Sequence, residues 1–107
     1  MKFGIEQHAI DVIFSVLCRH LTIEKVVIYG SRAKGNYRKG SDIDLTLMGE
    51  GLSEAELSII TAELDLLNTP YLFDVSIFDG LNSELKEHIM RVGQVFYQRN
   101  HGRKKLL

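Results

Sequence analysis

Short apolar runs alternate with amphipathic helical segments along this chain, and the alternation narrows the possible folds more than any other feature. Runs of strand character occupy residues 25–29, 42–48, 71–78 and, more weakly, 94–98. Apolar residues recur at helical spacing in residues 5–20, 53–67 and 83–92. In the second strand-like run, Ile43, Leu45 and Leu47 alternate with polar residues, as in a strand with one buried face. We therefore predict an α/β (α+β) fold, in which a small mixed sheet carries helices packed mainly on one face.

The length of 107 residues suits one small domain. We expect residues 1–107 to form it, with residues 99–107 as a frayed tail. Ser53 and Glu56 match a capping box, which predicts that a helix begins there. Cys18 is the single cysteine, so an intramolecular disulfide and a zinc site of paired cysteines are excluded; its apolar neighbours predict that it is buried. The N-terminal sequence resembles neither a signal peptide nor a membrane span, so we expect a cytoplasmic protein.

Charge is segregated along the chain, although the net charge is only −1. Five cations and no acid lie between Lys25 and Gly40, whereas ten acids and no cation lie between Ser41 and Leu85. The basic segment suits phosphates, and the acidic segment suits metal ions or a basic partner. Two solvated faces of opposite charge are the simpler alternative. The four histidines show no metal-ligand spacing, and we expect them to be surface or capping residues.

The most informative motif joins a glycine-serine turn to a pair of aspartates. The sequence Gly30-Ser31-Arg32-Ala33-Lys34-Gly35 follows a strand-like run, and Ser41-Asp42-Ile43-Asp44-Leu45 opens the next. Free backbone amides and the Ser31 hydroxyl suit a phosphate. Asp42 and Asp44 point to the same face of a strand, where a divalent cation relieves their mutual repulsion. Together these features predict a site for a phosphate group and a divalent cation, for which magnesium is the best candidate.

A third carboxylate, Asp74, interrupts the apolar run 71–78, and an isolated acid there needs a partner. Three carboxylates can hold two metal ions, which we expect to be Mg²⁺. Arg32 and Lys34 follow the turn and are further candidates for phosphate contact. The sequence lacks the Lys-Ser/Thr of a P-loop and the downstream residues of an EF-hand. The alternative is structural: a capped turn beside the wet face of an edge strand.

With these motifs, residues from about 5 to 98 resemble the minimal nucleotidyltransferase (MNT) domains of the DNA polymerase β-like nucleotidyltransferase superfamily. The resemblance implies a nucleotidyltransferase fold in which Gly30 and Ser31 hold the NTP phosphates. It also implies that Asp42 and Asp44 bind both metal ions and that Asp74 is the third carboxylate, in preference to the nearby Asp79. MNT domains are typically encoded beside a HEPN-domain protein, act as its antitoxin, and in some cases transfer AMP to it.

The expected activity is therefore magnesium-dependent transfer of a nucleoside monophosphate, with ATP as the first candidate donor, to a hydroxyl of a partner protein. We expect neither a membrane nor a nucleic acid as a direct partner. Two alternatives stay open: a non-catalytic module that neutralises its partner by binding, and an enzyme with a small-molecule or RNA acceptor. Because Glu54, Glu56, Glu63 and Asp65 have no cation at helical spacing, we also predict that their helix steers a basic partner.

Overall fold

The computed structural model describes residues 1–99, which form four α-helices, four strands and one 3₁₀ turn. In chain order the elements are α1 (Gln7–Leu17), β1 (Lys25–Tyr29), α2 (Ser31–Lys34), β2 (Ile43–Met48), α3 (Glu54–Asp65), β3 (Phe73–Ile77), η1 (Phe78–Gly80), α4 (Ser83–Val92) and β4 (Gln94–Gln98). Each predicted helix and strand is present, and the weak run 94–98 is a true strand. Within the described residues, no helix combines the length and the apolar character needed to cross a bilayer.

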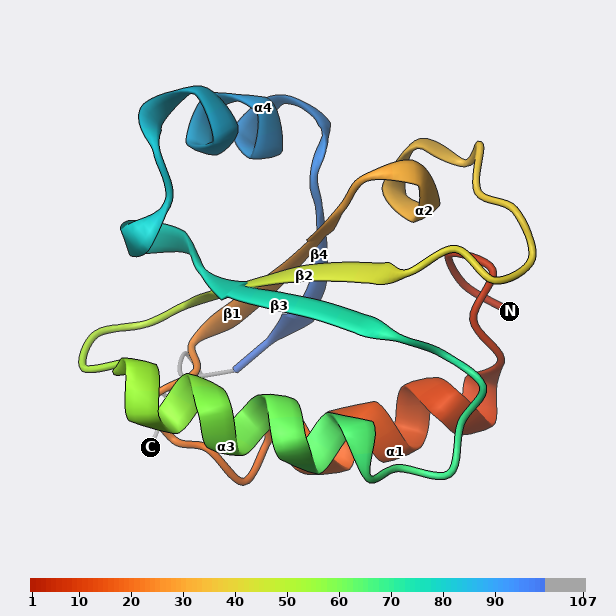
Figure 1. The fold of residues 1–107 in the computed structure, drawn as a ribbon, viewed down its shortest axis with the longest axis horizontal. Coiled ribbons are helices and arrows are strands. Elements are labelled where there is room, and N and C mark those ends of the chain that lie inside the picture. Colours follow the sequence, from red (N-terminus) through yellow and green to blue (C-terminus); the bar gives the residue numbers. More distant parts are fainter. Residues whose placement is uncertain (100–107) are drawn as a thin grey trace, which may run out of the picture.

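The four strands form one mixed sheet in the order β3-β2-β1-β4. β1 runs antiparallel to β2 and β4, whereas β2 and β3 are parallel. Figure 1 shows α1 and α3, the two longest helices, together against one face of this sheet, while α2 and α4 lie on the other side. The prediction of a small mixed sheet with its helices mainly on one face is confirmed.

The hydrophobic core lies between the sheet and the α1–α3 layer. It includes Ile13 of α1, Ile28 of β1, Leu45 of β2 and Leu64 of α3, all with no more than 1% of their surface exposed. Strand β2 therefore turns its apolar side to the helices and its polar side to the opposite face. A bulge in the β1–β4 pairing brings both Phe96 and Tyr97 of β4 into edge contact with the Phe14 ring.

Two expectations, one for Arg99 and one for Cys18, are wrong. Arg99 does not fray: its amide donates to the Glu24 carbonyl at 2.8 Å and its guanidinium donates to the carbonyls of Ile23 and His20. The rest of the predicted tail lies outside the described residues. Cys18 is exposed, because it is the C-cap of α1 and the helix ends before its side chain reaches the core.

The acidic helix α3 has partners that helical spacing does not reveal. Ser53 caps its N-terminus by accepting from the Glu56 amide at 3.1 Å, as predicted. The Glu56 and Glu63 carboxylates bind opposite ring nitrogens of His20 at 3.1 Å and 2.6 Å. Hydrogen bonds from Thr22 to Glu56 and from His20 to Glu63 lower the pKa of both carboxyl groups. These acids therefore fasten the loop before β1 to α3, a contact that the prediction of a steering helix did not include.

Candidate active site

Pairing of the strands brings two of the predicted carboxylates side by side. Asp44 lies opposite Asp74 in the parallel β2–β3 pair and opposite Tyr29 in the antiparallel β1–β2 pair. Residues directly opposite in register point to the same face of a sheet. Tyr29, Asp44 and Asp74 thus form one row across three strands, on the face turned away from the core. We call these three side chains the carboxylate row.

Gly30 brings the glycine-serine turn directly onto this row. Its φ angle is 76°, a conformation that favours glycine. A Cβ on Gly30 would lie 2.3 Å from Oδ2 of Asp44, so any side chain there would displace the carboxylate. The turn leads at once into α2, whose first residue is Ser31. The first backbone amides of a helix have no acceptor within the helix. Free N–H donors of α2 therefore start next to the Asp44 carboxylate.

The structure places Arg32 differently from an open phosphate ligand. Its side chain is buried, with 3% exposed, and its guanidinium donates to the carbonyls of Ser41, Phe3 and Gly4 at 2.8–3.2 Å. The rings of Tyr37 and Tyr71 lie 5.3 Å and 5.2 Å from the guanidinium carbon. Arg32 therefore ties α2 to the N-terminal segment and to the residue before Asp42. This is a positioning role, because its donors already have main-chain acceptors.

The other predicted site residues are open to solvent to different degrees. Ser31 and Asp44 are partly buried, whereas Asp42, Asp74 and Lys34 are exposed. Lys34 follows Arg32 but projects outward, so of the two predicted cations it is the accessible one. Asp42 precedes β2, two residues before Asp44. The glycine-serine turn, the carboxylate row and Asp42 therefore meet where β2 and β3 begin and β1 ends.

Burial and like charges shift the protonation of this row. Burial raises the pKa of Asp44, and the negative charges of Asp74 and Asp42 raise it further. The pKa of the Tyr29 phenol is also raised, first by burial and then by the two carboxylates Asp74 and Asp44. The Asp44 carboxylate is thus held where its charge is unfavourable, and the phenol stays protonated at neutral pH. A cation at this place would favour the charged form of Asp44.

The Asp44 and Asp74 carboxylates suit a magnesium ion that takes its remaining ligands from water and a substrate. In the part of the chain that the structure describes, no group of three or more His, Cys, Asp or Glu side chains is placed to hold a metal ion, Asp42, Asp44 and Asp74 included. Mg²⁺ commonly binds one or two carboxylates and takes its other ligands from water and substrate phosphates. Asp44 and Asp74, adjacent in register and beside a turn with free amides, match that pattern.

Three contributors were missed by reasoning from the sequence. Tyr29 joins the row because strand alternation places it on the face of Asp44, a relation visible only once β1 and β2 are paired. Gln94 of β4 donates to the Ala33 carbonyl of α2 at 2.8 Å and so holds α2 from across the sheet. Ser76 donates to the hydroxyl of buried Thr46 at 3.0 Å, in the next register row on the same face.

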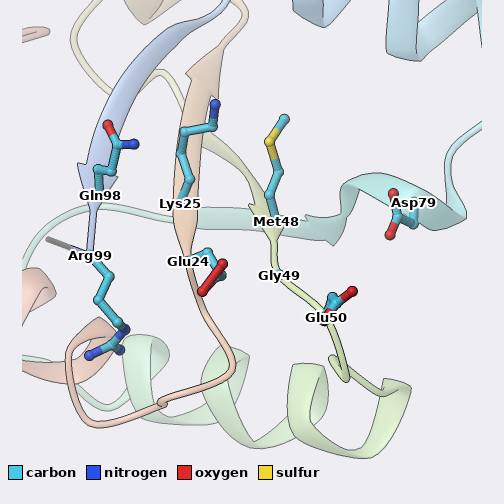
Figure 2. A pocket seen from close by; sticks show the side chains of 8 residues that line it. All are labelled: Glu24, Lys25, Met48, Gly49, Glu50, Asp79, Gln98 and Arg99. Atoms are coloured by element: carbon cyan, nitrogen blue, oxygen red, sulfur yellow. The ribbon is translucent and has the colours of Figure 1, made fainter. Parts of the chain in front are cut away.

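Two cavities flank the sheet at opposite ends. One, of about 500 Å³, adjoins the Arg32 contacts and is lined by Tyr37, Tyr71 and the exposed cations Arg38 and Lys39, among others. Figure 2 shows the other, of about 420 Å³, at the far ends of β1, β2 and β4. Asp79 lines this second cavity. The structure thus separates Asp79 from the carboxylate row and leaves Asp74 as the neighbour of Asp44.

A mixed sheet of this topology, with a glycine-serine turn beside paired carboxylates, defines a protein of the nucleotidyltransferase class. A family model described as "Polymerase beta, Nucleotidyltransferase" matches residues 11–102. The chain therefore belongs to the polymerase beta nucleotidyltransferase family. No curated protein sequence matches it.

Solved structures share the fold. A crystal structure of a toxin–antitoxin with AMP-PNP aligns with a TM-score of 0.70 at 16% identity, over 91% of this chain and 78% of that chain. A structure of the tri-AMPylated HEPN toxin of Shewanella oneidensis in complex with MNT antitoxin aligns at 0.66 and 14%, over 95% and 79%. A protein assigned as a minimal nucleotidyltransferase aligns at 0.68 and 25%, over 88% and 95%. The resemblance to MNT domains is confirmed.

Proposed function

We propose that this chain is a single magnesium-dependent nucleotidyltransferase domain that moves AMP from ATP to a hydroxyl of a partner protein in the cytoplasm. One observation carries the proposal: Asp44, which lies opposite Asp74 in register, meets Gly30, so candidate metal ligands adjoin candidate phosphate donors. The similar structures include a toxin–antitoxin with AMP-PNP and an AMPylated HEPN toxin with its antitoxin. These likenesses support a HEPN-domain protein as the acceptor and an antitoxin role for this chain.

In this proposal each side chain has a definable task. Gly30 and Ser31 hold the ATP phosphates through backbone amides and the Ser31 hydroxyl, and Lys34 supplies a nearby positive charge. Asp42, Asp44 and Asp74 would hold two Mg²⁺ ions, and the bound ions would neutralise phosphate charge and make the acceptor hydroxyl more acidic.

The reaction is an in-line displacement at the α-phosphorus. The acceptor oxygen forms a bond to that phosphorus, the bond to pyrophosphate breaks, and pyrophosphate leaves with the electron pair. Asp74, the exposed carboxylate of the row, takes the proton of the acceptor hydroxyl. Asp44 is more enclosed and is better suited to hold metal than to exchange protons with solvent.

The proposal is tested with ATP labelled on its α-phosphate, Mg²⁺ and the co-purified partner. Wild type should label the partner, and EDTA should abolish the label. Asp42→Asn/Asp44→Asn should lower the rate by at least roughly 100-fold, because losing metal ligands exceeds the cost of losing their supporting contacts. Asp79→Asn is the matched control and should label at the wild-type rate.

Three outcomes would contradict this assignment. Equal labelling by wild type and Asp42→Asn/Asp44→Asn would show that these aspartates are not part of the catalytic site. Absence of labelling by a wild-type complex that binds its partner tightly would leave the interaction module as the function instead. Labelling of RNA or of a small molecule in place of the partner would identify a different acceptor.

A further inference from the structure

Helix α3 carries an apolar stripe on its outer side. Ile59 and Leu66, the latter at the C-cap, are 53% and 85% exposed. Ala55 and Ala62 are exposed on the same side of the helix. These four residues, which we call the α3 stripe, are spaced 4, 3 and 4 residues apart, as in the seam of paired helices. The core-facing residues Ile60 and Leu64 lie on the opposite side, so α3 is apolar on two faces.

No other element in residues 1–99 buries the α3 stripe. Figure 1 shows α3 on the outside of the molecule, with the sheet on its inner side. Leu21, which is 78% exposed, lies beside the stripe, because its neighbours His20 and Thr22 are both bonded to Glu56 of α3. Apolar side chains gathered on one exposed face are typical of an interaction site. The alternation of alanine with a large side chain leaves hollows that a second helix can fill.

The charges beside the stripe decide what fits it. In the heptad frame set by the stripe, Glu56, Glu63, Ser58 and Asp65 occupy the flanking positions that face a partner helix. Glu56 and Glu63 bind His20, and Glu63 also lies 3.8 Å from the Arg19 guanidinium, yet the two carboxylate side chains remain 23% and 33% exposed. A second copy of α3 would oppose acids with acids in either orientation, which is destabilising. A partner with Lys or Arg at its flanking positions would instead meet opposite charge.

We propose that the α3 stripe is the docking surface for an amphipathic helix of another protein, whose apolar seam is flanked by basic residues. The surface belongs to the helix layer, on the opposite face of the sheet from the carboxylate row. A helix bound to the stripe therefore does not cover the carboxylate row. The partner helix binds on the helix-covered side of the sheet and leaves the carboxylate row accessible.

Photo-cross-linking in the native host maps the occupant. A benzoylphenylalanine is placed at Ile59 or at Leu66 of the full chain, with Leu72 and Met90 as controls, since these are 68% and 69% exposed elsewhere. The first two positions should cross-link to a helical segment with Lys or Arg beside its apolar residues, and the controls should not. Cross-links to a second copy, to the chain itself, or equally from all four positions would overturn the proposal.

The affinity of the α3 stripe for a helix can be measured with synthetic peptides. Two synthetic helices of about three heptads, with Leu at the seam and either Lys or Glu at the flanks, are titrated by fluorescence anisotropy. The Lys-flanked helix should bind and weaken with salt, and the Glu-flanked helix should not bind. Ile59→Ser/Leu66→Ser should weaken binding by about tenfold or more, the loss of two anchors. Leu72→Ser/Met90→Ser should not change it. Failure of the Lys-flanked helix to bind, or equal loss in both double variants, would refute the docking surface.

Discussion

At the scale of single residues, Asp44 shows how a site that serves chemistry weakens the protein that carries it. The carboxylate is partly buried, faces Asp74 in register, and touches the turn at Gly30. A bound cation would favour the charged carboxylate in these surroundings. Without a cation, the negative charge of Asp44 destabilises the folded state. Asp44 therefore connects stability to pH in a direction opposite to that of an ordinary paired carboxylate.

We predict that Asp44→Asn stabilises the metal-free protein at neutral pH. The pKa of Asp44 is raised in the fold, first by burial and then by Asp74 and Asp42, so the folded state binds its proton more tightly than the unfolded state. That stabilisation is full below the ordinary Asp pKa of about 3.9 and is lost as pH rises through the raised value. In EDTA, the Tm of Asp44→Asn should exceed that of wild type by a few degrees at pH 7, and the two should converge in acid.

Added Mg²⁺ should raise the Tm of wild type and not that of Asp44→Asn, because binding to the folded state alone is stabilising. Asp79→Asn, at the far end of the sheet, should follow wild type in both conditions. A lower Tm for Asp44→Asn than for wild type in EDTA would show that the carboxylate is held by favourable contacts instead.

At the scale of elements, signals within a segment were readable from the sequence and contacts between segments were not. The cap at Ser53 and the helix Ser83–Val92 were predicted at their observed positions, because both depend on neighbours a few residues away. Arg32 has the same sequence context as a phosphate ligand, yet its acceptors come from Phe3, Gly4 and Ser41. The aspartate pair was predicted from strand alternation, but its alignment with Asp74 required the β2–β3 register.

Arg32 fastens three segments, so its substitution should cost stability. Arg32→Lys keeps the charge, but a single ammonium group cannot replace the planar guanidinium that donates to carbonyls of separate segments. We expect a loss of about 2–3 kcal/mol in the free energy of unfolding, because buried carbonyls lose their donors. Lys34→Ala, an exposed neighbour, should change it by less than about 0.5 kcal/mol. Urea unfolding followed by circular dichroism measures the free energy of unfolding of both variants. If Arg32→Lys loses as little as Lys34→Ala, the N-terminal segment does not depend on Arg32 for its stability.

At the scale of the whole molecule, the sheet separates two surfaces of different chemistry. The carboxylate row lies on one face, and the α3 stripe belongs to the helix layer on the other. A core of aliphatic side chains fills the space between them. This arrangement allows one chain to be an enzyme and a bound partner at the same time, with separate sets of residues for each.

The separation predicts two opposite phenotypes. Asp42→Asn/Asp44→Asn should stop transfer while leaving the Kd for the co-purified partner within about twofold, since distant sites act additively. Ile59→Ser/Leu66→Ser should weaken the partner complex and leave Mg²⁺-dependent ATP binding unchanged. Titration calorimetry with ATP and with the partner distinguishes them. Loss of both bindings in either variant would show that the two faces are one functional unit.

The central position of β1 has a consequence for synthesis of the chain. β1 pairs with β4, so Lys25 meets Gln98 and Ile28 meets Gln94 only after nearly the whole described chain has been made. Until then one edge of β1 has no neighbour, and Val26 and Ile28 are without part of their cover. Contacts this distant in sequence form slowly and leave strand edges open to other chains. A nascent chain at the ribosome thus has its glycine-serine turn and its aspartates before β4 completes the sheet that carries them.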